Sequence, residues 1–136
     1  MPELKPIVVE RIEATRIVAA PAALDALAWP QDAPPETLIL RIAPDEMLIT
    51  TTLTADVVDD PHAILATDAG FAGVWVAIGE ALDFLGRSCE WELPRERPAF
   101  AQGAVAGLPV KLWFEEDRVL FLVPAPYATD LEERMS

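Results

Sequence analysis

The sequence contains few of the residues that build metal sites, nucleophilic centres and disulfides. Among its 136 residues there is one cysteine, Cys89, and one histidine, His62. A single cysteine excludes an intrachain disulfide, which fits a reducing compartment. His62 lies in Asp59-Asp60-Pro61-His62. A metal site is one interpretation, but such sites use more ligands at defined spacing, so we interpret the segment as a polar surface turn. Cys89 falls near the carboxyl end of a predicted helix, on its apolar side, so we expect a buried structural thiol.

Basic side chains and long apolar runs are also scarce. Ten lysines and arginines stand against 23 aspartates and glutamates, for a net charge of −13. Nucleic-acid binding needs clustered basic residues, so we expect no nucleic-acid partner, and the charge also disfavours anionic membranes. No window approaches the roughly 18 apolar residues of a membrane span. Glu3, Glu10 and Glu13 interrupt the apolar patches at the N-terminus, so no signal-peptide core is recognised. We therefore expect a cytoplasmic protein with no membrane partner.

Motifs for catalysis and cofactor binding are missing too. Gly103 and Gly107 form neither a dinucleotide-binding fingerprint nor a phosphate loop, and no serine or lysine lies in a recognisable nucleophile setting. Glu90 and Glu92, and the run Glu115–Asp117, could form acid–base pairs, but charged turns are usually solvated. The sequence thus predicts no catalytic residue, no cofactor and no metal.

What the sequence does have is the composition of one globular domain spanning residues 1–136. Hydrophobic residues make up 52% and charged residues 24%, enough for a core and unlike a disordered chain. Phe71–Ile78 has the composition of a buried strand, and Gly79 breaks it before a helix. The predicted core stripe of that helix is Ile78, Leu82, Leu85 and Cys89, and its predicted solvent side is Glu80, Asp83, Arg87 and Glu90.

Strands and two short helices are predicted for the rest of the chain. The strands are expected at Ile7–Ile12, Arg16–Ala19, Thr37–Ile42, Met47–Leu53, Ala63–Ala66, Ala101–Ala106, Val110–Phe114 and Val119–Val123, and the helices at Ala22–Ala28 and Tyr127–Met135. Pro44 presets a type I turn for one hairpin, and Asp68-Ala69-Gly70 predicts a turn before the Phe71 strand. The order indicates an α+β fold with a mostly antiparallel sheet and two or three helices.

Both faces of the predicted sheet are apolar, although a sheet with helices on one side normally shows polar residues on the other. By alternation, the second face would carry Trp75, Trp113, Leu120 and Leu122. Another layer of the chain, a second copy or a different subunit must cover it. We interpret these four residues as an interface, with a homodimer or a larger enzyme subunit as the partner. Trp29, among prolines, and Trp91, between glutamates, are candidate ligand contacts.

Several short motifs, in their order, match a known family. They are the hairpin segment Ala43–Leu48, Asp68 before a strand, Gly79 opening a helix with Leu82 and Leu85, Cys89–Leu93 after that helix, and the hairpin Leu108–Val123 before a final helix. With these motifs the chain resembles the gamma subunit of heterotetrameric sarcosine oxidase, a relative of the folate-binding domain of the glycine-cleavage aminomethyltransferase. The family has a serine shortly after the aspartate, where this chain has Ala69-Gly70. It also has a proline after the glycine, where this chain has Glu80.

The resemblance implies an α+β fold with ferredoxin-like ββα halves. It also implies a non-catalytic subunit beside a flavin- and folate-dependent amine oxidase, and it carries over no catalytic residue. The first expectation is therefore an interaction module. The alternative is a small-molecule binding domain that holds a flat, folate-like ligand on the sheet face or near Trp29 and Trp91. A sheet face buried by protein would favour the first, and an enclosed pocket with convergent polar groups the second. An independent enzyme is the third and least favoured hypothesis.

Overall fold

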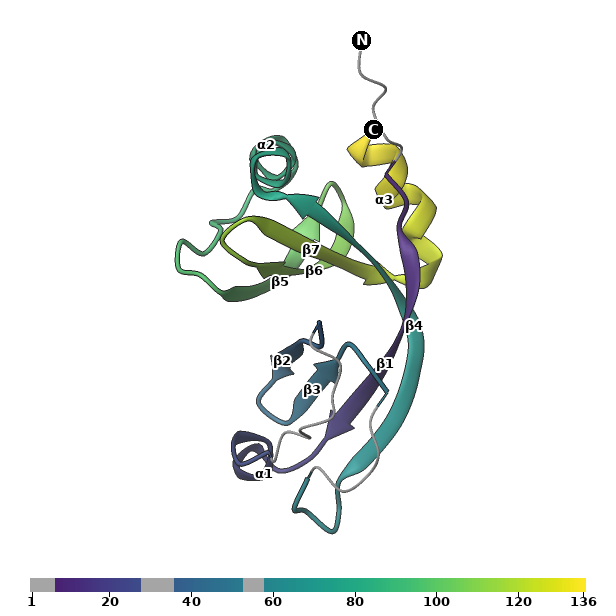
Figure 1. The fold of residues 1–136 in the computed structure, drawn as a ribbon, viewed down its shortest axis with the longest axis vertical. Helices are drawn as coiled ribbons and strands as arrows, with labels where there is room; N and C mark the ends of the chain where they lie inside the picture. Colours follow the sequence, from purple (N-terminus) through teal and green to yellow (C-terminus); the bar gives the residue numbers. More distant parts are fainter. Residues whose placement is uncertain (1–6, 28–35, 53–57) are drawn as a thin grey trace. The chain divides into compact units, whose positions relative to one another are not determined.

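The computed structural model describes residues 7–27, 36–52 and 58–136, and the chain forms two compact units (Figure 1). Unit 1 comprises Met1–Arg11 with Gly70–Ser136, and unit 2 comprises Ile12–Ala69. Two strands cross the boundary between the units, β1 (Glu10–Val18) and β4 (Ile64–Ala77). The described residues form seven strands and three α-helices, and all pairings recorded between strands are antiparallel. The predicted α+β class with a mostly antiparallel sheet is confirmed.

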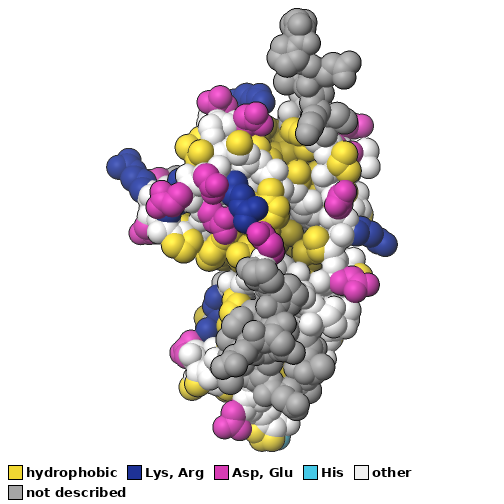
Figure 2. Space-filling view, viewed as in Figure 1, with side chains coloured by type: hydrophobic (Ala, Val, Ile, Leu, Met, Phe, Trp, Pro, Cys, Tyr) yellow, Lys and Arg dark blue, Asp and Glu magenta, His cyan; other side chains and the backbone are white. Residues whose placement is uncertain are grey.

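Unit 1 is a four-stranded arrangement in the order β4-β7-β6-β5, with two helices. Its other elements are α2 (Ile78–Ser88), β5 (Ala99–Val105), β6 (Leu108–Phe114), β7 (Arg118–Pro124), the 3₁₀ turn η2 (Ala125–Tyr127) and α3 (Ala128–Met135). Helices α2 and α3 lie on the same side of these strands (Figure 1), and both contribute to one core cluster. In that cluster the rings of Phe84 and Phe121 meet edge to face, with centroids 5.9 Å apart. Figure 2 shows acidic side chains scattered over the visible surface, in keeping with the net charge.

Unit 2 has strands in the order β2-β3-β1 and one short helix. Its elements are β1, α1 (Pro21–Asp25), β2 (Ile39–Ala43) and β3 (Glu46–Ile49). Pro21 occupies the first turn of α1, as predicted, where its missing N–H has no intrahelical partner to lose. The predicted hairpin around Pro44 is confirmed as the β2–β3 connection. The core cluster of this unit contains Ile17, Ala19, Leu24, Met47 and Ile49.

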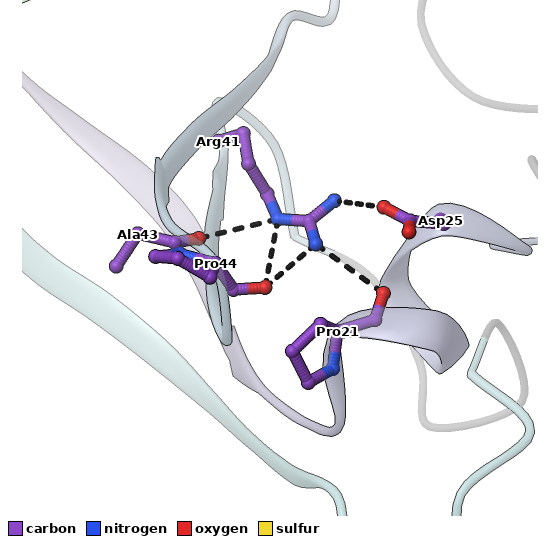
Figure 3. Close-up of polar contacts among 5 residues, drawn as sticks. All are labelled: Pro21, Asp25, Arg41, Ala43 and Pro44. Carbon is purple, nitrogen blue, oxygen red and sulfur yellow. Dashed lines mark hydrogen bonds and ion pairs between the residues drawn. The ribbon is translucent and has the colours of Figure 1, made fainter.

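Arg41 ties helix α1 to the β2–β3 hairpin (Figure 3). Its guanidinium donates to the carbonyl oxygens of Ala43 and Pro44 at the turn and to the carbonyl oxygen of Pro21 at the start of α1. Arg41 Nη1 also forms an ion pair of 2.9 Å with Asp25 Oδ1. Because α1 is only five residues long, this external anchor gives it a fixed place beside the hairpin.

The two units share a connectivity in which a strand enters a helix and a later hairpin returns to pair with that strand, and unit 1 has the additional strand β5 between its helix and its hairpin. In unit 2 the hairpin β2–β3 pairs with β1, and in unit 1 the hairpin β6–β7 pairs with β4. Each junction between strand and helix is fixed by the same backbone hydrogen bond to an aspartate in the hairpin turn. Ala19 N donates to Asp45 O at 3.0 Å, and Ile78 N donates to Asp117 O at 2.9 Å. This bond needs no particular side chain, so the sequence does not reveal the repeat.

Strand β4 is continuous through Asp68-Ala69-Gly70, so the turn predicted there is wrong. Aspartate and glycine favour turns locally, but both also adopt extended backbone, and strand pairing on the β7 side already begins at Phe71. The segments Ile7–Ile12 and Arg16–Ala19, predicted as separate strands, belong to one strand, β1, which begins only at Glu10 and ends at Val18. The first predicted strand therefore begins three residues too early. Strand β3 ends at Ile49, so the strand predicted over Met47–Leu53 is too long, and its last residue, Leu53, lies outside the described residues. The loop around Trp29 also lies outside them.

Helix α2 is present as predicted, but the phase of its buried side is partly wrong. Leu82, assigned to the core stripe, is 40% exposed, while Ala81, Phe84 and Leu85 are buried. The prediction followed steps of four and three through Leu82 and overlooked Phe84, whose larger ring gains more from burial. The predicted solvent side of Glu80, Asp83, Arg87 and Glu90 is confirmed. In the described parts of the chain, none of the helices has the length and hydrophobicity to cross a membrane.

Candidate functional site

The strand register of unit 1 brings the four predicted interface residues to one face of its sheet. Trp75 on β4 and Trp113 on β6 lie opposite Leu120 on its two sides, and Leu122 follows on the same face of β7. We call the side of the sheet that carries these residues the tryptophan face. Leu120 and Leu122 are 7% and 1% exposed, whereas both tryptophans are half-buried. Within this face Leu122 closely covers Gly73, where an added Cβ would lie 2.7 Å from Leu122 Cδ2.

An ion pair joins the two indoles of the tryptophan face. The guanidinium carbon of Arg118 lies 3.7 Å from the ring centroid of Trp75, a close cation–π contact. Arg118 Nε donates to Glu115 Oε1 at 2.8 Å, and Trp113 Nε1 donates to Glu115 Oε2 at 3.2 Å. The glutamate therefore holds the arginine on one indole and orients the other. Trp and Arg side chains in such fixed positions are the ones that most often dominate protein interfaces.

The Glu115 carboxylate is stabilised in its charged form. The hydrogen bond from Arg118 holds the pKa of Glu115 below its usual value, and the hydrogen bond from Trp113 and the charge of Arg118 act in the same direction. Partial burial opposes them. A lowered pKa keeps the ion pair intact at neutral pH, and it makes Glu115 a poor proton donor or acceptor there. The arrangement is suited to holding side chains in place and not to acid–base chemistry.

A cavity of about 400 Å³ lies along the β5–β6 hairpin. Its lining residues are Gln102, Gly103, Ala104, Gly107, Leu108, Pro109, Val110 and Lys111. Lys111 Nζ donates to Gln102 Oε1 at 3.0 Å and lies 5.7 Å from the ring centroid of Phe71. The volume of this cavity is within the range of small-molecule sites, and the polar side chains that line it are one cation, Lys111, and one amide, Gln102. Such a set can hold an anionic or amide group.

Trp91 is held against the sheet of unit 1. Its Nε1 donates to Ala104 O at 2.8 Å, and a Cβ on Gly103 would lie 2.9 Å from the indole. The ring is half-buried and packs against the core, so much of its surface and its N–H are already in use. Whether Trp91 contacts a ligand remains a prediction. The other candidate contact, Trp29, lies outside the described residues.

The remaining candidates from the sequence are His62, with its neighbour Asp60, and Cys89, and each takes part in hydrogen bonds within the chain. His62 is exposed, and Asp60 accepts hydrogen bonds from the backbone N–H groups of Ala20 at 3.0 Å and His62 at 2.9 Å. The bond from Ala20, followed by that from His62, lowers the pKa of Asp60. Cys89 is half-buried, and its Sγ lies 3.5 Å from Trp91 O. Over residues 7–27, 36–52 and 58–136, no three histidine, cysteine or carboxylate side chains gather as a metal site would require.

The ion pair between Arg118 and Glu115 was not predicted from the sequence. Its signal was present, because alternation places Glu115 on the same face as Trp113 and Arg118 on the same face as Leu120, across a short turn. The run Glu115–Asp117 was instead treated as uniformly solvated, although only Glu116 and Asp117 are exposed.

Comparison of the chain with protein-family models and with curated proteins finds no match.

Proposed function

We propose that the protein is a non-catalytic interaction module, a counterpart of the gamma subunit of heterotetrameric sarcosine oxidase, which docks on a larger enzyme subunit. The observation that carries this proposal is the pair of half-buried indoles, Trp75 and Trp113, linked through Arg118 and Glu115. Side chains fixed before binding lose little rotamer entropy when a partner covers them. The tryptophan face therefore offers a partner aromatic area at low entropic cost.

The charge of the chain favours a different subunit over a second copy at this face. Two chains of net charge −13 repel each other, whereas a partner with a basic surface is attracted and steered towards the site. The proposal includes a cytoplasmic location, which the single cysteine supports. It also includes the finer description of the fold as ferredoxin-like ββα halves, which the repeated strand–helix–hairpin connectivity of the two units supports.

The experiment compares retention of a partner by three immobilised proteins: the wild type, Trp113→Ala, and Leu82→Ala as a control. Leu82 is an exposed apolar side chain on α2, which packs on the opposite face of the sheet. Extract from the source cells is passed over each, and bound proteins are quantified by mass spectrometry. We expect one larger protein to bind the wild type and the control equally and Trp113→Ala at least about tenfold less, the effect of a 1.4 kcal/mol loss. Circular dichroism verifies that all three are folded. Equal retention by all three would refute docking through the tryptophan face.

A second function, binding of a folate-like small molecule, is favoured by the cavity along the β5–β6 hairpin. Lys111 and Gln102 at this cavity can pair with the carboxylate and amide groups of such a ligand. Folinic acid is the probe, titrated against the purified chain by calorimetry. Saturable binding that Lys111→Gln weakens would support this function, and no binding at about 1 mM would remove it.

A further inference from the structure

Strand β5 is an edge strand that lacks the charged side chains and proline which usually protect such edges. It ends the order β4-β7-β6-β5 and pairs with β6 at all seven of its positions. In the part of the chain that the structure describes, no strand pairs with its other side. Its sequence, Ala-Phe-Ala-Gln-Gly-Ala-Val, contains no charge and no proline. Natural edge strands normally carry such groups because they prevent pairing with other chains.

The hydrogen-bond phase of β5 shows which backbone groups point away from β6. Ala104 lies opposite Pro109, which has no N–H to donate, and Ala104 O instead accepts from Trp91 Nε1 on the outer side. Phe100, four residues earlier in the same strand, has the same phase, so its N–H and carbonyl also point outward. Among the described residues, no backbone-to-backbone hydrogen bond outside the ladders reaches Phe100.

Trp91 covers only one end of this edge. Its indole lies at Gly103 and Ala104, where it occupies the carbonyl oxygen and would obstruct an added strand. The other end, around Phe100, has no such cover from the indole. The Phe100 side chain is half-buried and lies opposite Trp113, so it belongs to the tryptophan face. The part of the edge that the indole leaves uncovered is therefore short, carries no charged residue of β5, and is adjacent to an aromatic surface.

We propose that two copies of this chain pair through the edges of β5, antiparallel and about a two-fold axis, with the Phe100 backbone of each copy bonded to the strand of the other. A two-fold pairing places an uncharged strand against itself, so no like charges meet across the new ladder. It brings the two Phe100 side chains towards each other and sets the two tryptophan faces side by side, so that each face stays open to a different subunit. The net charge of −13 on each copy opposes this approach but is screened by salt.

This inference goes beyond the proposed function and does not depend on it. Docking on a larger subunit uses the Trp75 and Trp113 side chains, whereas pairing uses the backbone of β5. The purified chain alone suffices to test the pairing, so failure of one proposal leaves the other intact.

Sedimentation equilibrium of the full chain, up to about 500 μM, at about 0.05 M and about 0.5 M NaCl tests the pairing. We expect a monomer–dimer equilibrium that is at least about tenfold tighter at the higher salt, because screening removes repulsion between the two acidic copies. A dimer that weakens with salt, or a monomer at about 500 μM in both salts, would overturn the proposal.

Two substitutions at one position separate edge pairing from other contacts. Phe100→Pro removes the outward N–H without touching the ladder to β6, and Phe100→Ala is the matched control, since it also loses the ring but keeps the N–H. The dimer constant of Phe100→Pro should be at least about tenfold weaker than that of Phe100→Ala. Equal dimerisation of the two would place the contact elsewhere and overturn the proposal. If Phe100→Pro does not fold, hydrogen exchange of the wild type decides. The Phe100 amide must gain protection as protein concentration rises, and unchanged protection refutes the pairing.

Discussion

Helix α2 allows a direct test of the core of unit 1, because two large apolar side chains two residues apart have opposite environments. Phe84 is 4% exposed, meets Phe121 edge to face and has the Arg87 guanidinium 5.5 Å from its ring centroid. Truncation to alanine removes a buried ring and leaves a cavity, so Phe84→Ala should cost about 3–5 kcal/mol of unfolding free energy. Leu82 is 40% exposed, and water fills the space left by Leu82→Ala, so its cost should stay below about 1 kcal/mol.

Urea unfolding measures both costs, followed by tryptophan fluorescence, because Trp75, Trp91 and Trp113 all lie in unit 1. The dependence of the free energy on urea should be the same for both variants, so that midpoints can be compared. If Leu82→Ala costs as much as Phe84→Ala, the helix has the phase first expected from the sequence and the packing described for α2 is incorrect.

Other perturbations act on the polar contacts of unit 1. Glu115→Gln should cost up to about 1 kcal/mol at pH 7, as a partly exposed ion pair does. The folded pKa of Glu115 is lowered from 4.5, so this contribution is present above about pH 4.5 and is lost as pH falls through the lowered pKa. Thermal melts of the wild type and the variant from about pH 7 to pH 3 should therefore converge in acid, and a constant difference would contradict the bridge to Arg118. Gly103→Ala should cost about 1–3 kcal/mol, because its Cβ would lie 2.9 Å from the rigid Trp91 indole, and an unchanged melting temperature would show that the ring moves freely. Trp91→Phe should cost about 1 kcal/mol through the lost hydrogen bond to Ala104 O, and a neutral result would remove the anchoring role of Trp91.

The tryptophan face could be predicted from the sequence because alternation along a strand follows from backbone geometry alone. Once β6 and β7 are recognised as a hairpin, Trp113 and Leu120 must share a face, and the register confirms that they do. The phase of α2 was harder, because apolar residues at Ile78, Ala81, Leu82, Phe84 and Leu85 fit more than one stripe. Packing against Phe121 selects among these stripes, and that partner is distant in sequence.

The continuity of β4 and the backbone bonds at the strand–helix junctions could not be predicted from neighbouring residues either, because both depend on segments that are distant in the sequence. Strand β4 lies between β1 and β7 in the strand order, and pairing with these strands from elsewhere in the chain outweighs the local turn preference of Asp68 and Gly70. The backbone bonds from Ala19 to Asp45 and from Ile78 to Asp117 join segments whose side chains take no part in them. A sequence shows which side chains can interact, but it does not show where a carbonyl group will point.

The repeated connectivity of the two units helps to distinguish features of the scaffold from the side chains that the proposed interaction would use. Both units fix a strand–helix junction through the carbonyl of a turn aspartate, so this feature belongs to the scaffold. The strands of unit 2 contain no tryptophan, and the arginine of its hairpin, Arg41, anchors helix α1. In unit 1 the hairpin arginine, Arg118, instead stacks on Trp75 and meets Glu115 on the tryptophan face. Because the strand–helix junction of unit 2 is fixed without such side chains, the junction itself does not require them in unit 1, which supports the proposed interaction.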